Sequence, residues 1–287
     1  MPSPIFELKD ISFRYNPRAP FALKGVNLRL YAGETFGLVG ESGSGKTTLG
    51  RCVAGACTAS GQLFYQGKET ARLCRAERRL WRQKTQVVFQ SAAASLSPRL
   101  TVEKSLMEAL KLGRFGGGRA AREKKAEELL GAVGLGAQHL ARFPKELSGG
   151  QRQRVVIARA LAMEPDYLVA DEPVSSLDAP VQAQIMALFE KLRKERGVGC
   201  LLIAHDLALV RQVCSRIGVL WQGRLVELGP GESLFCRPLH PYTRRLLASR
   251  LPLEPGAPLP EREALANCPP GGVWKQSGPG HFWLAPA

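Results

Sequence analysis

Hydrophobic and polar residues alternate near the start of the chain. Residues 5–15 and 22–31 both follow a two-residue period, which is typical of strands with one buried face, and the turn-forming segment 16–20 separates them. A continuous apolar run then fills residues 35–39, as expected for a strand that is buried on both faces. These patterns predict an antiparallel pair of strands followed by the first strand of a buried sheet.

Further segments with strand or helix periodicity follow. Short apolar runs predict strands at residues 61–67, 85–89, 167–170 and 200–204, and a hairpin of 216–222 and 224–228. The 3.6-residue period predicts helices at residues 70–83, 101–112, 119–134, 152–161 and 180–195. We therefore expect an α/β fold in which a helical subdomain, at about residues 91–164, interrupts the sheet.

The composition changes beyond Gly229, where prolines become frequent. We expect a main domain over residues 1–235 and a C-terminal extension over residues 236–287. The extension is expected to be largely irregular apart from one short helix near 240–249, because about the last thirty residues offer little material for a core.

The segment 40–48 carries the pattern GxxxxGK[S/T] of a phosphate-binding loop, placed between a predicted strand and a segment that can continue as a helix. Its glycines let the backbone curl so that successive N–H groups face one anion. Lys46 supplies a positive charge, and the Thr47 hydroxyl can ligate Mg²⁺. We expect a nucleoside triphosphate here, bound by Gly40, Glu41, Ser42, Gly43, Ser44, Gly45, Lys46, Thr47 and Thr48.

A second glycine-containing segment precedes the predicted helix 152–161. Ser148 is a good helix N-cap, and Gly149, Gly150 and Gln151 follow it. A helix start of this kind offers backbone N–H groups and a partial positive charge, so it can bind a second anion. A capped glycine loop without a ligand is the alternative.

Acidic and polar residues stand where predicted buried strands end. Asp171 can hold Mg²⁺ through water, and Glu172 can take a proton from the attacking water, with a salt-bridged acidic pair as the alternative. Gln90 can reach the metal or the attacking water, although glutamine at such a place is also an ordinary loop residue. His205 can meet the γ-phosphate or serve as a structural hydrogen bonder.

Two further features lie at the ends of predicted elements. Tyr15 ends the first predicted strand, so its ring can stack on a nucleotide base or simply be a strand-end aromatic. The turn from Ser175 to Asp178 precedes the helix 180–195 and caps it.

The composition is that of a soluble globular protein, with 45% hydrophobic and 23% charged residues. Apolar runs stay below the ~18 residues of a membrane span and the start lacks a signal-peptide pattern, so we expect a cytosolic chain unless a partner holds it at a membrane. The seven scattered cysteines form no CxxC pair, which indicates a reduced compartment. The net charge of +15 suits a solvated face or an anionic lipid surface better than nucleic acid, because no aromatic residues interleave with the charges.

Taken in chain order, these segments resemble the ATP-binding cassette family over about residues 5–250. The resemblance is carried by Tyr15, 40–48, Gln90, 147–151, 168–172, 175–178 and His205. It implies a P-loop NTPase core of the RecA-like type with an antiparallel β subdomain and an inserted helical subdomain. It also implies that two cassettes pair head to tail, so that the Ser148–Gly150 segment of each clamps the γ-phosphate held by the other.

The resemblance implies roles at matching positions, with ATP and Mg²⁺ as cofactors. The expected catalytic residues are Lys46, Gln90, Glu172 and His205. The expected metal-binding residues are Thr47, Gln90 and Asp171. Tyr15, the loop 40–48, Ser148, Gly149, Gly150, Gln151 and Asp178 are expected to bind the nucleotide.

Three stretches are similar to the importer ATPases for oligopeptides, dipeptides and nickel. They are residues 95–102 after Gln90, the run Arg152-Gln153-Arg154, and the segment 239–247 with its His-Pro-Tyr-Thr sequence. Ser91 and Ser97 depart from the Asp and Asn that are common there. Many relatives carry four C-terminal cysteines that hold an iron–sulfur cluster, but only Cys268 remains here, so no such cluster is expected.

The resemblance implies an ATP-hydrolysing subunit of a binding-protein-dependent importer for di- or oligopeptides, held at the cytoplasmic face of the plasma membrane. The expected partners are a second, related ATPase subunit, two integral-membrane permeases and a substrate-binding protein, and no nucleic acid. A nickel or metal-chelate importer is the alternative. A soluble cassette ATPase acting on DNA or ribosomes, or a catalytically idle adaptor, is a more distant one.

Overall fold

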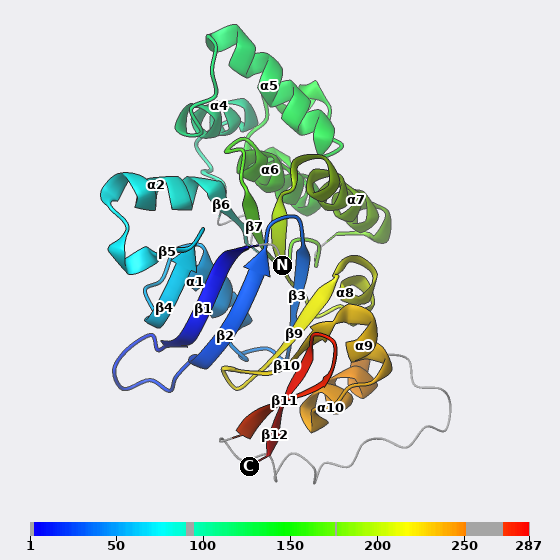
Figure 1. The fold of residues 1–287 in the computed structure, drawn as a ribbon. Coiled ribbons are helices and arrows are strands. Elements are labelled where there is room, and N and C mark those ends of the chain that lie inside the picture. The colour runs from blue at the N-terminus through cyan, green and yellow to red at the C-terminus, as the bar shows by residue number, and fades with distance from the viewer. Residues whose placement is uncertain (1–2, 90–94, 176, 251–271, 287) are drawn as a thin grey trace. The chain divides into compact units, whose positions relative to one another are not determined.

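The computed structural model describes every residue except 1–2, 90–94, 176, 251–271 and 287, and the chain divides into two compact units (Figure 1). The first unit consists of residues 1–73 and 201–287, so the two ends of the chain build it together. The second unit consists of residues 74–200. It extends beyond the helical subdomain expected at 91–164, because it also contains strands and a long helix.

An antiparallel sheet forms one part of the first unit. Its strand order is β2-β1-β4-β5, with the bounds β1 (Pro4–Phe13), β2 (Leu23–Tyr31), β4 (Ser60–Tyr65) and β5 (Lys68–Glu69). Leu8 of β1 pairs with Leu28 of β2, and both side chains are buried. The alternating pattern therefore predicted this pair of strands correctly, because a period of two puts every second side chain on the core face.

A second sheet in the first unit contains the strand that leads into the phosphate loop. The bounds of its strands are β3 (Thr35–Val39), β9 (Arg216–Trp221) and β10 (Arg224–Pro230), together with residues 201–203 of β8 (Gly199–Ile203). β3 is parallel to β9, and β9 is antiparallel to β10. All five residues of β3 are buried, as its continuous apolar run predicts. The helices α1 (Lys46–Val53) and α8 (Leu207–Val213) belong to the same unit.

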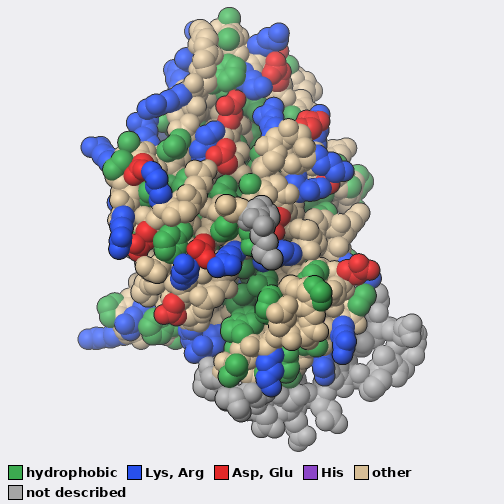
Figure 2. Space-filling model, viewed as in Figure 1, with side chains coloured by type: hydrophobic (Ala, Val, Ile, Leu, Met, Phe, Trp, Pro, Cys, Tyr) green, Lys and Arg blue, Asp and Glu red, His purple; other side chains and the backbone are tan. Residues whose placement is uncertain are grey.

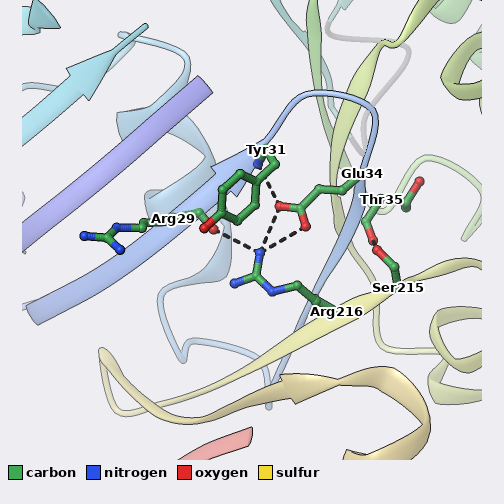
Figure 3. Close-up of polar contacts among 6 residues, drawn as sticks. All are labelled: Arg29, Tyr31, Glu34, Thr35, Ser215 and Arg216. Carbon is green, nitrogen blue, oxygen red and sulfur yellow. Dashed lines mark hydrogen bonds and ion pairs between the residues drawn. The ribbon is translucent and has the colours of Figure 1, made fainter. Parts of the chain in front are cut away.

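A half-buried ion pair fixes the start of β3 (Figure 3). The Arg216 guanidinium donates to both carboxylate oxygens of Glu34, at 3.1 and 3.0 Å, and to the carbonyl of Arg29. The Glu34 carboxylate also accepts the N–H of Tyr31 at 2.8 Å, and burial raises the pKa of Glu34 although Arg216 opposes this shift. The turn between β2 and β3 is thereby tied to β9, which fixes the strand that carries the phosphate loop.

The C-terminal segment contains more regular structure than the sequence predicts. After α9 (Gly231–Cys236) and α10 (Pro241–Arg250), the strands β11 (Gly272–Gly278) and β12 (His281–Pro286) form a hairpin. β12 pairs with β10, where Glu227 lies opposite Trp283. The expectation of an irregular tail is wrong for residues 272–286, because β11 and β12 pair with each other and β12 also adds to the edge of β10.

The second unit packs helices around two strands. β6 (Thr85–Val88) and β7 (Tyr167–Asp171) are parallel neighbours. The helices are α2 (Arg75–Lys84), α4 (Val102–Leu112), α5 (Arg119–Ala132), α6 (Gly149–Leu161) and α7 (Ala179–Arg196). The helix expected at 70–83 begins instead at Arg75, because Glu77 accepts the N–H of Cys74 and defines the helix start there.

The surface carries the charge that the composition implies. Figure 2 shows Lys and Arg side chains spread over the face in view, with Asp and Glu side chains between them. Among the described residues, no helix is both long enough and apolar enough to cross a membrane.

Candidate functional site

Two glycines of the phosphate loop occupy positions that no other residue fits. The loop runs from the end of β3 to the start of α1, and Gly40 and Gly45 have φ values of 152° and 106°. A Cβ atom at Gly40 would lie 2.2 Å from the carbonyl oxygen of Leu220, and one at Gly45 would lie 2.4 Å from that of Ala22. The loop therefore passes so close to neighbouring backbone that only glycine lets it take this path.

Lys46 holds its positive charge inside the loop. Its side chain is buried, and its ammonium donates to the carbonyls of Gly40 at 2.8 Å and Glu41 at 2.7 Å. The Ser44 hydroxyl lies 3.4 Å from the same nitrogen. An ammonium held at the loop by backbone carbonyls can attract a polyphosphate.

Tyr15 contacts the helix that follows the loop. Its hydroxyl lies 2.9 Å from the Thr48 hydroxyl, and its ring packs edge-on against Phe13 with centroids 5.0 Å apart. The residue is still 58% exposed. An aromatic face held at one edge of the phosphate loop and open to solvent is suited to stacking on a base.

The two acids at the end of β7 have different surroundings. The Asp171 side chain is buried, whereas Glu172 is half-buried and has a φ of 51°. The carbonyl of Glu172 accepts hydrogen bonds from the N–H and the hydroxyl of Ser175, at 3.4 and 3.2 Å. The turn thus holds Glu172 in a left-handed conformation that non-glycine residues rarely adopt and that is enriched at functional sites.

The start of α6 has a capping box and is exposed to solvent. The Ser148 hydroxyl accepts the N–H of Gln151 at 3.2 Å, and the Gln151 side chain accepts the N–H of Ser148 at 3.0 Å. Ser148 and Gly149 are exposed, and a Cβ atom at Gly149 would meet nothing within 4 Å. An anion can therefore approach the first N–H groups of this thirteen-residue helix closely.

The remaining predicted site residues divide between the units. Asp178 is the exposed N-cap residue of α7 in the second unit. His205 is exposed directly after β8 in the first unit, where the neighbouring Asp206 caps α8 by accepting the N–H groups of Ala208 and Leu209. Gln90 lies outside the described residues.

The predicted residues thus belong to two different units of the structure. The first unit contains Tyr15, the loop 40–48 and His205, and the second contains Ser148, Gly149, Gly150, Gln151, Asp171, Glu172 and Asp178.

Sequence reasoning missed two contacts that hold the phosphate loop from outside. The N–H of Gly223, in the turn between β9 and β10, donates to the carbonyl of Ser44 at 3.0 Å. The hydroxyl of Tyr242 in α10 accepts the N–H of Glu41 at 2.8 Å. The His-Pro-Tyr-Thr sequence was a signal for the second contact, but its pattern alone gives no partner more than 200 residues away.

The comparisons with known proteins concern the family of the chain. The family model described as "ABC transporter" matches residues 23–175. The oligopeptide transport ATP-binding protein OppF of Streptococcus mutans is 42% identical over 249 residues, which cover 85% of this chain and 81% of the relative. The oligopeptide transport ATP-binding protein AmiF of Streptococcus pneumoniae is 44% identical over 253 residues, which cover 87% and 82%.

Solved structures give the same answer. The dimeric bacterial ABC transporter cassette MJ0796 is 31% identical, with a TM-score of 0.72, and the match covers 78% of this chain and 98% of that one. The cbiO1 protein of Clostridium perfringens is 26% identical, with a TM-score of 0.71 and coverage of 87% and 96%. The resemblance inferred from the sequence is confirmed, and the chain belongs to the ABC transporter family.

Proposed function

We propose that this chain is the ATP-hydrolysing subunit of a binding-protein-dependent importer that takes up di- or oligopeptides. The observation that carries this proposal is the geometry of the loop 40–48. A Cβ atom at Gly40 or Gly45 would lie 2.2 or 2.4 Å from a backbone carbonyl oxygen, and the Lys46 ammonium is hydrogen-bonded within the loop. A nucleoside triphosphate is the ligand that suits a backbone cradle, a fixed ammonium and an adjacent exposed tyrosine ring.

The donor set suits Mg²⁺ as the companion of the triphosphate. The Thr47 hydroxyl and the buried Asp171 carboxylate are oxygen ligands, which magnesium prefers together with water and phosphate oxygens. Gln90 would complete the set. The metal would neutralise charge on the β- and γ-phosphates.

The residues of this chain then take the following roles. Lys46 binds the outer phosphates, Glu172 accepts a proton from the attacking water, and His205 contacts the γ-phosphate. The left-handed backbone conformation of Glu172 supports its role as proton acceptor. Such a conformation costs about 1–3 kcal/mol in a non-glycine residue, and proteins keep it mainly at functional sites. Tyr15 stacks on the base.

The second glycine segment acts on a nucleotide bound by another cassette. Ser148 and Gly149 are exposed at the start of α6, and a helix N-terminus that is open to solvent favours an anionic ligand brought by a partner. We therefore propose a head-to-tail dimer with a related ATPase subunit, in which Gly150, Gln151 and Asp178 line the same seam.

The importer is completed by proteins outside this chain. Two integral-membrane permeases would hold the ATPase pair at the cytoplasmic face of the plasma membrane, and a substrate-binding protein would deliver the peptide. The names of the relatives, which refer to oligopeptide and dipeptide transport, favour peptides over the alternative, a nickel or metal-chelate importer.

The purified transporter complex provides the test. ATP hydrolysis should rise several-fold when the binding protein is loaded with an oligopeptide, and Glu172→Gln should abolish this rise. Stimulation by nickel and not by peptide would support the alternative cargo. Equal hydrolysis by the parent complex and by Lys46→Ala would contradict the ATPase assignment.

A further inference from the structure

The C-terminal helix α10 contacts the phosphate loop directly. The hydroxyl of Tyr242, in the first turn of the helix, accepts the backbone N–H of Glu41 at 2.8 Å. One turn later, Arg245 donates to the Glu41 carboxylate, also at 2.8 Å. The helix therefore holds one residue of the loop through both its backbone and its side chain.

The tyrosine itself has little freedom. It is fully buried, and its ring stacks on Trp221 at the end of β9 with centroids 5.4 Å apart and planes inclined by 23°. Its backbone N–H donates to Nδ1 of His240 at 3.1 Å. A rigid aromatic ring with its hydroxyl aimed at the loop can fix the position of what it binds.

A buried carboxylate anchors the segment that enters the helix. Glu227 of β10 is completely buried and accepts the N–H groups of Leu239 at 3.0 Å and His240 at 2.9 Å. Nε2 of His281, in the C-terminal strand β12, lies 2.8 Å from the same carboxylate. The hairpin at the end of the chain, strand β10 and the start of α10 are thus linked through one side chain.

Tyr242 and Lys46 form hydrogen bonds with the same peptide group. The N–H of Glu41 and the carbonyl of Gly40 belong to the peptide that joins these residues. Tyr242 accepts from its N–H end, and the Lys46 ammonium donates to its carbonyl end at 2.8 Å. Because the peptide is planar, the hydroxyl that fixes its N–H also fixes the direction of the carbonyl that holds the lysine.

We propose that Tyr242 is a positioning residue for the phosphate loop, through which the C-terminal segment sets the affinity for nucleotide. The hydroxyl fixes the peptide between Gly40 and Glu41 and, through it, the place of the Lys46 ammonium. A loop that is already held in one conformation loses less freedom when it binds a phosphate chain, so it binds more tightly. This inference depends on the proposed function, in which the loop binds ATP.

The test removes one oxygen atom at a time from α10. Tyr242→Phe keeps the buried ring and its stacking on Trp221 but cannot accept the N–H of Glu41. Thr243→Val is the matched control, because Thr243 is also fully buried and its hydroxyl makes no hydrogen bond within the described part of the chain. Lys46→Ala serves as the variant that disables the loop itself.

Two measurements on the full chain separate positioning from simple packing. The dissociation constant for the N-methylanthraniloyl derivative of ATP should rise about 3- to 10-fold in Tyr242→Phe, within the range of one hydrogen bond's net contribution, and stay within about 2-fold in Thr243→Val. Hydrogen exchange at the Glu41 amide should become about 10-fold faster in Tyr242→Phe alone. Thermal midpoints of the two variants should agree within a few degrees.

The outcomes distinguish the inference from the function on which it depends. If the parent chain binds the probe, Lys46→Ala does not, and Tyr242→Phe behaves like Thr243→Val, the positioning role is wrong and the nucleotide site stands. If the parent chain and Lys46→Ala both fail to bind the probe, the nucleotide site and the positioning role fall together.

Discussion

The contact between Gly45 and the carbonyl of Ala22 gives the sharpest test of the phosphate loop. An alanine at position 45 would place its Cβ 2.4 Å from that oxygen, whereas ordinary contact begins at 3.4 Å, so the loop would have to move by about 1 Å. The φ of 106° at this position is an additional strain for any residue with a Cβ.

The matched control is Gly67→Ala. Gly67 also has a positive φ, 78°, but a Cβ there would meet nothing within 4 Å, and the residue lies in the turn between β4 and β5. Both substitutions should cost about 1–2 kcal/mol of stability from the left-handed backbone. Only Gly45→Ala should also displace the loop.

A displacement of about 1 Å in a catalytic site can lower a rate by about 100-fold. We therefore expect Gly45→Ala to lower both ATP affinity and ATP turnover at least 10-fold, measured by fluorescent-nucleotide titration and phosphate release. Gly67→Ala should leave both quantities unchanged while it lowers the thermal midpoint. Tight nucleotide binding by Gly45→Ala, or equal losses in the two variants, would refute the reasoning from loop geometry.

Four more predictions follow from the other contacts. Glu172→Gln should keep ATP binding and slow hydrolysis by about 10²–10⁴, the usual contribution of a general base, and unchanged hydrolysis would remove that role. Ser148→Arg should preserve ATP binding by the isolated chain but reduce turnover of the assembled transporter, so loss of binding by the isolated chain would contradict the head-to-tail arrangement. Burial lowers the pKa of His240 from 6.5, although Glu227 opposes this shift, so the unfolded chain binds more protons than the folded chain just below pH 6.5. The free energy of unfolding, measured by urea denaturation, should therefore fall as the pH decreases through that value. A free energy of unfolding that rises instead would exclude a buried neutral imidazole. Burial raises the pKa of Cys52 and of Cys200 to about 12, whereas Cys74 and Cys236 are exposed. Iodoacetamide at pH 8 should therefore label Cys74 and Cys236 before Cys52 and Cys200, as measured by mass spectrometry. Early labelling of Cys52 would contradict the packing of α1.

Short sequence patterns predicted most of the strands and helices. The apolar run 35–39 is the fully buried strand β3, and the alternating residues 5–15 and 22–31 became the antiparallel pair β1 and β2. Ser148 caps α6 as its position before a helical segment predicts. In each case the information lies within a few residues, because burial of one face gives alternating apolar residues and burial of both faces gives a continuous apolar run.

The contacts that the sequence did not reveal join segments far apart in the chain. β11 and β12 were expected to be irregular, but they pair with each other, and β12 also pairs with the distant strand β10. Likewise, Glu227 and His281 are an isolated acid and an isolated histidine in the sequence, and only the folded sheet brings them within 2.8 Å. The left-handed backbone of Glu172 is also invisible in the sequence, since the turn that imposes it has no distinctive pattern.

In the proposed dimer, a triphosphate is held between the loop 40–48 of one cassette and the start of α6 in another. A structure of the ATP-loaded transporter, prepared with Glu172→Gln to slow hydrolysis, measures this directly. We predict that the Ser148 hydroxyl and the Gly150 N–H lie within hydrogen-bond distance, about 2.7–3.2 Å, of the γ-phosphate whose outer oxygens contact Lys46 of the opposite subunit. A bound ATP that touches the Lys46 loop but lies far from every Ser148 in the assembly would contradict it.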